Sequence, residues 1–213
     1  MNFSLNTNRE DLSLMQSTIA KFCESEIAPE YDKWENDGIF PRDLWNKLGQ
    51  AGLLCVDIPE KYGGHGADAE MALNIPCGIA CGNYGSVAVG MSVHSDIVAH
   101  YILNRGSENQ KLNYLPKMVT GELVGAIAMT EPAAGSDLQG IQTKAKKQNG
   151  GWVLNGSKTF ITNGQNANLI QGLLPVTYAD NSGFMQDFQE VQGYPNYYVP
   201  QQGILDTRPV LDA

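Results

Sequence analysis

Residues 125–137 read Gly-Ala-Ile-Ala-Met-Thr-Glu-Pro-Ala-Ala-Gly-Ser-Asp, at the point where the chain changes from helical to strand-like patterning. The first half is an apolar run typical of a buried strand, and the second is a turn of small residues that ends in a hydroxyl and a carboxylate. Small residues let a backbone approach a large flat or phosphorylated ligand closely. A second stretch, residues 158–164, predicts a short strand with one aromatic and two threonines. Together the two stretches indicate a nucleotide cofactor.

Composition narrows the class of protein. With 213 residues, of which 42% are hydrophobic and 17% charged, the chain suffices for one large or two modest globular domains. The net charge of −9 argues against a binder of nucleic acid or anionic membranes, since phosphate groups favour a basic surface. A local anion site made of backbone N–H groups needs no net positive charge and stays open.

Targeting signals and cysteines give further expectations. The most hydrophobic helical segment, residues 86–103, is interrupted by His94, Asp96 and His100, so we expect no membrane span. No signal or Arg-rich transit peptide is visible, which predicts a cytoplasmic protein, or a mitochondrial matrix protein in a eukaryote. The cysteines form no CxxC pair and lack a nearby histidine, so we expect reduced, mostly buried thiols rather than a zinc site; they are Cys23, Cys55, Cys77 and Cys81.

Residues 7–120 read as successive helices. Thr7 followed by Glu10 is a capping-box pattern, and another helix begins near Ser107. Pro76 predicts that the helix around it is irregular. We therefore expect an N-terminal all-α domain over residues 1–122.

After residue 122 the pattern predicts strands joined by tight turns. Asn-Gly dipeptides, which hairpin turns prefer, stand at 149–150, 155–156 and 163–164. The expected strands are residues 123–129, 141–148, 152–154 and 158–162. The fold class is therefore α+β, with an incomplete antiparallel β-domain over residues 123–170. Residues 171–213 have no lysine and no clean periodicity, and we expect an irregular tail there.

Several motifs have a structural as well as a functional interpretation. Ser92, His94 and Asp96 contain the residue types of a catalytic triad, yet neighbours on a helix point about 100° apart, which favours satisfied helix polar groups. The simplest interpretation of Glu131 and Asp137 is that each accepts hydrogen bonds from backbone amides of its own turn. Phe160 is a core residue or a platform for a cofactor.

Residues 128–140, Ala-Met-Thr-Glu-Pro-Ala-Ala-Gly-Ser-Asp-Leu-Gln-Gly, resemble the signature of the acyl-CoA dehydrogenases. Residues 155–164, Asn-Gly-Ser-Lys-Thr-Phe-Ile-Thr-Asn-Gly, match the next strand pair of that family at the expected separation. The similarity covers roughly residues 8–170. Within the family, residues 125–144 most resemble the long-chain type.

The resemblance implies a helical domain, a β-domain and FAD bound between the β-domain and a C-terminal helical bundle. Thr130 would offer a hydroxyl to the flavin, Phe160 would pack on its ring system, and Thr162 would lie near the reactive nitrogen. Ser136 would also meet the acyl-CoA thioester. The residues expected to line the flavin are Ile127, Ala128, Met129, Thr130, Gly135, Ser136, Phe160, Ile161 and Thr162.

The family reaction removes an α-proton with a glutamate base while a β-hydride passes to FAD, giving a trans-2-enoyl-CoA in fatty acid β-oxidation. The implied partners are an acyl-CoA substrate, electron-transfer flavoprotein as electron acceptor, and copies of the same chain. The base belongs to the C-terminal bundle, which is not recognisable in this sequence, and Glu190 is the only acid in a candidate position. We therefore assign no catalytic residue and expect a truncated chain. The alternatives are a non-catalytic fragment or binding protein of the same fold and an acyl-CoA oxidase-like flavoenzyme.

Overall fold

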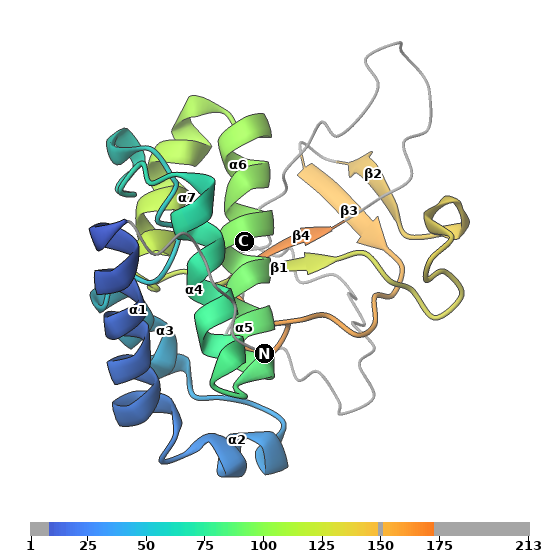
Figure 1. Ribbon diagram of the computed structural model, residues 1–213. Coiled ribbons are helices and arrows are strands. Elements are labelled where there is room, and N and C mark those ends of the chain that lie inside the picture. The colour runs from blue at the N-terminus through green and yellow to red at the C-terminus, as the bar shows by residue number, and fades with distance from the viewer. Residues whose placement is uncertain (1–8, 149–150, 173–213) are drawn as a thin grey trace. The chain divides into compact units, whose positions relative to one another are not determined.

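The computed structural model describes residues 9–148 and 151–172, which form helices first and a small amount of sheet afterwards (Figure 1). The chain divides into two compact units, with the boundary between Gly125 and Ala126. We call residues 9–125 the helical unit and residues 126–172 the sheet unit, and each is described by itself. Within the described residues, no helix is long and apolar enough to cross a membrane.

The helical unit consists of short helices linked by tight turns. A π-helical turn, Val93–Val98, joins α5 to α6 without a break, and a second one, Cys23–Ile27, extends α1. The helices are α1 (Glu10–Phe22), α2 (Tyr31–Asp37), α3 (Arg42–Gln50), α4 (Ala69–Cys81), α5 (Gly85–Ser92), α6 (Ala99–Arg105) and α7 (Glu108–Val119). This confirms the prediction that the first part of the chain is helical.

The predicted helix starts were right in one case and wrong in another. Ser107 caps α7 with a complete capping box, in which its hydroxyl accepts from the Gln110 amide and the Gln110 side chain accepts from the Ser107 amide. The capping box at Thr7 was wrong, because α1 begins at Glu10 with Arg9 as its N-cap. Thr7 itself lies outside the described residues.

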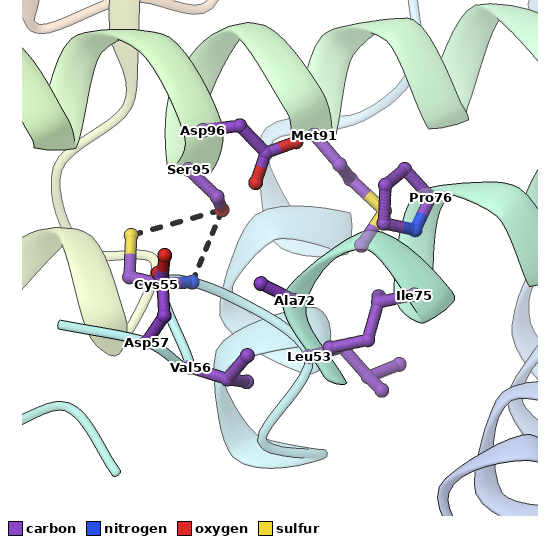
Figure 2. A pocket seen from close by; sticks show the side chains of 10 residues that line it. All are labelled: Leu53, Cys55, Val56, Asp57, Ala72, Ile75, Pro76, Met91, Ser95 and Asp96. Atoms are coloured by element: carbon purple, nitrogen blue, oxygen red, sulfur yellow. Dashed lines mark hydrogen bonds between the residues drawn. The ribbon is translucent and has the colours of Figure 1, made fainter. Parts of the chain in front are cut away.

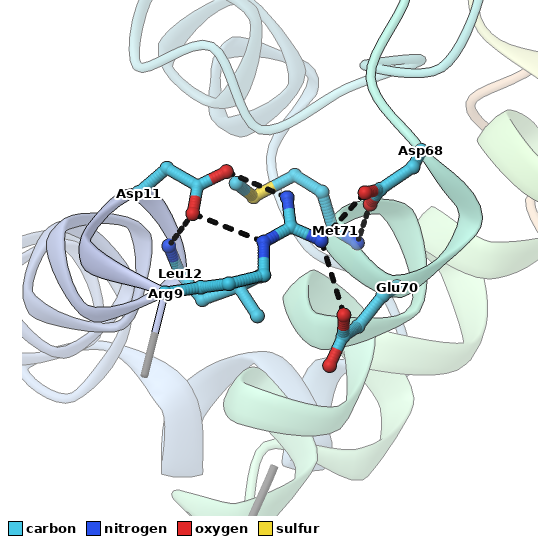
Figure 3. Close-up of polar contacts among 6 residues, drawn as sticks. All are labelled: Arg9, Asp11, Leu12, Asp68, Glu70 and Met71. Atoms are coloured by element: carbon cyan, nitrogen blue, oxygen red, sulfur yellow. Dashed lines mark hydrogen bonds and ion pairs between the residues drawn. The ribbon is translucent and has the colours of Figure 1, made fainter. Parts of the chain in front are cut away.

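Arg9 links the start of α1 to the start of α4. Its guanidinium donates to Asp11 in the first turn of α1 and to Asp68 and Glu70 at the start of α4 (Figure 3). Asp68 also caps α4 by accepting from the Met71 amide, 2.9 Å away. Because these side chains are 30–53% exposed, water screens the ion pairs and they contribute little to stability.

α4 runs unbroken through Pro76, so the expected irregularity was wrong. Gly78 in this helix faces Ile19 of α1, and an added Cβ would lie 3.1 Å from the Ile19 Cγ2 atom. The missing side chain therefore lets α1 and α4 approach closely. The largest fully buried side chains of the helical unit are Trp45, Tyr62, Ile27, Leu44, Leu48, Leu53, Leu54, Ile58, Ile79, Met91, Ile102 and Leu115.

His94 is fully buried and uses both of its ring nitrogens. Nδ1 accepts from the Gly125 amide at 3.0 Å, so Nε2 carries the proton and donates to the Met118 carbonyl at 3.1 Å. Burial lowers the pKa of His94 to about 4. The residue is thus a neutral structural connector, in agreement with the prediction that Ser92, His94 and Asp96 form no triad.

The cysteines are all free thiols. Cys23 and Cys55 are buried, whereas Cys77 is half-buried and Cys81 exposed. The expectation of mostly buried thiols therefore holds for only two of them. Within the described ranges, no group of three or more His, Cys, Asp or Glu side chains is arranged to hold a metal ion.

The sheet unit contains two separate strand pairs. β2 (Lys144–Gln148) pairs antiparallel with β3 (Gly151–Asn155), with Lys144 opposite Asn155 and Gln148 opposite Gly151. β1 (Gly125–Ala128) pairs with β4 (Leu169–Gly172), and these two run in the same direction (Figure 1). The expected antiparallel domain was therefore too simple. The predicted turn at residues 149–150 lies outside the described residues.

The strand predicted over residues 158–162 was wrong. Phe160 and Asn163 have φ angles of 57° and 66°, in the left-handed region, which an extended strand does not contain. The segment is an irregular connection that ends in a turn, where the Gly164 amide donates to the Ile161 carbonyl at 2.9 Å. β4, which follows it, was not predicted.

His94 makes the stability of the helical unit depend on pH. Its folded pKa of about 4 lies below the ordinary value of 6.5, so its contribution is complete above pH 6.5 and is lost as pH falls to 4. The shift corresponds to about 3 kcal/mol. We expect His94→Gln to flatten the pH dependence of urea unfolding in this window. The same slope in His94→Gln as in the wild type would contradict this role.

Gly49 tests the packing of α3 on the end of α7. A Cβ at Gly49 would overlap the carbonyl group of Thr120, whereas one at Gly85 would meet nothing within 4 Å. Gly49→Ala should therefore cost about 1–3 kcal/mol of unfolding free energy. The matched variant Gly85→Ala should be neutral or stabilising by up to about 1 kcal/mol. Chemical denaturation measures both, and equal effects would show that this close approach is absent.

Candidate functional site

The first predicted ligand segment, residues 130–137, forms a loop after β1 in which Glu131 and Ala134 are buried and most other residues are exposed. Glu131 and Ala134 exchange two backbone hydrogen bonds of 2.8 and 3.1 Å, which close a tight turn. Asp137 accepts from the Gln139 amide at 3.1 Å and caps a 3-10 turn, Leu138–Gly140. Gly135 lies at the exposed part of the loop, where an added Cβ would meet nothing within 4 Å. The backbone there is open to an approaching ligand.

Glu131 is buried and holds two segments of the sheet unit together. Its carboxylate accepts from the backbone amides of Gln142 at 2.7 Å and Thr143 at 3.0 Å. Burial alone raises the pKa of Glu131, but hydrogen bonds from Thr143 and Gln142 and the ammonium of Lys158 outweigh it and lower the pKa to about 2. The side chain is therefore ionised at neutral pH. The prediction that Asp137 accepts an amide of its own turn is confirmed. Glu131 also accepts backbone amides, but they belong to a segment 11 and 12 residues further on, so the expected local turn contact was wrong for it.

Lys158 completes the arrangement around Glu131. Its Nζ lies 2.9 Å from Glu131 Oε1, and only 5% of either side chain is exposed. The same Nζ donates to the Met129 carbonyl at 3.0 Å. One residue further on, the Thr159 amide donates to the Thr130 carbonyl at 2.9 Å. These contacts bring the two predicted ligand segments side by side.

Phe160 follows at once and points away from the core. Its side chain is 85% exposed, and its φ of 57° lies in a region that costs a non-glycine residue about 1–2 kcal/mol. A large apolar ring that is both exposed and held in a strained backbone conformation is typical of a ligand platform. Of the two interpretations of Phe160, the structure excludes the core residue.

The other predicted site residues differ in exposure. Ala128 is buried, whereas Gly135 and Ser136 are exposed. The remainder are half-buried, namely Ile127, Met129, Thr130, Ile161 and Thr162. Contacts join Met129 and Thr130 to the second segment, but Gly135 and Ser136 make no hydrogen bond to it within the described residues.

Sequence reasoning missed the pairing of Glu131 with Lys158. Both lie inside the two motifs, but nothing in either motif shows that their side chains are buried. The sequence contains no local signal for this pairing, because Glu131 and Lys158 are 27 residues apart and the strand expected over residues 158–162 is absent.

The helical unit has a small cavity of its own, between α4, the π-helical turn Val93–Val98 and residues 53–57 (Figure 2). Ser95 accepts from the Cys55 amide at 3.1 Å, and Asp57 contacts His100 at 2.7 Å. Burial raises the pKa of Asp96, and it raises that of Cys55 to about 12, so Cys55 is an unreactive thiol. The cavity has room for about one water molecule, so it is no candidate for a nucleotide or acyl chain.

Comparison with known proteins gives the same family for both units. Family models match the acyl-CoA dehydrogenase N-terminal domain over residues 9–122 and the middle domain over residues 126–191. The second match extends past residue 170, where we expected the similarity to end. The chain belongs to the acyl-CoA dehydrogenase family.

Three similar proteins place the chain more closely. The long-chain specific acyl-CoA dehydrogenase of pig (Sus scrofa) is 47% identical over 71% of this chain and 35% of its own length. The acyl-CoA dehydrogenase of Geobacillus kaustophilus has a TM-score of 0.74 and 46% identity over 79% of this chain and 44% of its own. The acyl-CoA dehydrogenase of Bacillus anthracis, complexed with FAD, has a TM-score of 0.70 and is 32% identical over 79% of this chain and 29% of its own. The chain thus spans less than half the length of each relative.

Phe160 provides a test of the strained backbone. Phe160→Gly should leave the unfolding free energy of the ligand-free chain unchanged or raise it by up to about 1 kcal/mol, because the left-handed conformation suits glycine. Leu73→Gly is the matched control, since Leu73 is also exposed but lies within α4, and it should cost about 1 kcal/mol. Urea unfolding measures both variants. A clear loss of stability in Phe160→Gly would show that the ring packs on the protein.

Proposed function

We propose that this chain is the flavin-facing part of an FAD-dependent acyl-CoA dehydrogenase of the long-chain type, which converts an acyl-CoA to a trans-2-enoyl-CoA. The observation that carries the proposal is the juxtaposition of residues 128–131 with residues 158–162, which leaves the ring of Phe160 exposed beside half-buried threonines. The identity to long-chain relatives supports the substrate class.

The residues present fit a flavin. Phe160 offers a flat apolar wall, and stacking of a planar heterocycle on such a ring is worth about 1–3 kcal/mol. The hydroxyls of Thr130 and Thr162 make no hydrogen bond within the described residues, so both can bond polar atoms of the ring system. Gly135 leaves the loop backbone open. The residues proposed to bind FAD are Ile127, Ala128, Met129, Thr130, Gly135, Ser136, Phe160, Ile161 and Thr162.

The described residues would bind and orient the cofactor and the substrate, and none of them is assigned to move the proton. When bound, FAD supplies the acceptor for the hydride from the β-carbon. Ser136, exposed on the loop, is proposed to contact the acyl-CoA thioester. We assign the α-proton base to no described residue, and Glu190 lies outside them. The proposal has three further parts. Electron-transfer flavoprotein is the electron acceptor, and the chain assembles with copies of itself. In a eukaryote it is located in mitochondria, as the long-chain relatives are.

A second candidate is a protein of this fold that binds FAD or acyl-CoA without turnover. It is favoured by the absence of an assigned base among the described residues, because loss of a general base costs about 10²–10⁴ in rate. An acyl-CoA oxidase-like enzyme differs in passing its electrons to oxygen. The described residues contain no feature that favours the oxidase.

The proposal is tested with the purified chain, FAD and a long-chain acyl-CoA in the absence of oxygen. FAD that is retained on gel filtration and loses its visible absorption on addition of the acyl-CoA would support the dehydrogenase. Retention without bleaching would support the binding protein. A chain that retains no FAD would contradict the dehydrogenase and leave the second candidate only as a protein that binds acyl-CoA.

Phe160 gives a sharper measurement of the same proposal. Phe160→Ala should weaken FAD binding about tenfold or more, because it removes the stacking surface. The FAD titration is followed by quenching of flavin fluorescence. Leu73→Ala, which removes an exposed apolar side chain in the helical unit, should leave the affinity unchanged. Equal affinities for the wild type and Phe160→Ala would place the flavin elsewhere.

A further inference from the structure

Glu131 and Lys158 are buried together where the two ligand segments meet. The carboxylate accepts two backbone amides, and the ammonium bonds both the carboxylate and the Met129 carbonyl. Met129 and Glu131 stand on either side of Thr130, so Lys158 fixes the chain immediately before and immediately after that residue. The carbonyl of Thr130 is held as well, by the amide of Thr159.

We propose that Glu131 and Lys158 are positioning residues, which set the spacing between the hydroxyl of Thr130 and the ring of Phe160 before any cofactor binds. The inference rests on the proposed function in so far as these two groups face a flavin. Phe160 is two residues beyond Lys158, and the left-handed φ of Phe160 turns its ring outward. A displacement of Lys158 therefore moves both flavin-facing groups relative to each other.

Stability alone does not account for a pair of this kind. The free energy needed to remove two charges from water offsets much of their attraction. Apolar residues of similar volume in the same place are often equally stabilising. Hydrogen bonds to ionised groups are, by contrast, short and directional. Four such bonds converge on these two side chains, from residues 129, 142 and 143 and between the pair itself. The arrangement fixes geometry in a way that an apolar contact does not.

The carboxylate also has a role that no cation can take. It accepts hydrogen bonds from the amides of Gln142 and Thr143. A lysine in its place has only N–H donors, which would face these two amide donors without an acceptor between them. Exchanging the two charges, in Glu131→Lys with Lys158→Glu, should therefore fail to restore the arrangement. In a simple ion pair the exchange would restore it. Lys158→Arg keeps a cationic donor for both Glu131 and the Met129 carbonyl, so it should restore much of the arrangement.

The first experiment uses hydrogen exchange of the full chain without cofactor. In Glu131→Gln and Lys158→Met, the Thr159 amide should exchange about tenfold faster or more, because its acceptor at Thr130 is no longer held. In Glu131→Gln the amides of Gln142 and Thr143 should also lose protection. Lys117→Met is the control, since the ion pair of Lys117 with Glu122 is exposed and lies in the helical unit. Unchanged exchange at Thr159 in both variants would overturn the inference, whatever FAD does.

The second experiment measures FAD affinity and the visible spectrum of the bound flavin. Lys158→Met should weaken FAD binding about tenfold or more and shift the spectrum, Lys158→Arg should recover most of both, and Lys117→Met should change neither. Wild-type affinity and spectrum in Lys158→Met would overturn the positioning role while leaving the proposed function intact. A wild-type chain that binds no FAD would overturn the proposed function, and with it the flavin-facing part of this inference.

Discussion

The sheet unit depends on one buried carboxylate and its partner ammonium. Glu131 and Lys158 are each almost fully removed from water, which is costly for a charge unless hydrogen bonds replace those to water. The amides of Gln142 and Thr143 and the carbonyl of Met129 supply such hydrogen bonds. The same contacts that make the buried charges tolerable thus join three segments that are distant in sequence.

The helical unit solves a similar problem without charge. His94 is buried and neutral, with one ring nitrogen accepting a hydrogen bond and the other donating one. It joins the last turn of α7, at Met118, to the first residue of β1, Gly125. Its lowered pKa follows from that burial. In both units a polar side chain satisfies backbone groups at a chain connection, where no regular helix or strand partner exists.

Local signals predicted the elements whose causes are local. The capping box at Ser107 and the amide bonded by Asp137 involve neighbours in sequence, so they could be inferred without a fold. The amides that Glu131 accepts, at Gln142 and Thr143, lie 11 and 12 residues away and depend on the fold. The failures have tertiary causes. The left-handed Phe160 interrupts an apparently regular strand pattern, and the burial of Lys158 depends on a partner in another segment. The family resemblance supplied the roles proposed for Thr130 and Phe160, which no spacing or composition would give.

The central claim is that residues 128–131 and 158–162 form a cradle for a flavin, fixed by Glu131 and Lys158. A crystal structure of the chain grown with FAD tests it most directly. The account predicts the flavin ring stacked on Phe160, a hydrogen bond from Thr130, and Lys158 still bonded to Glu131 and the Met129 carbonyl. A flavin bound away from Phe160, or Lys158 turned out to solvent with the flavin in place, would contradict it.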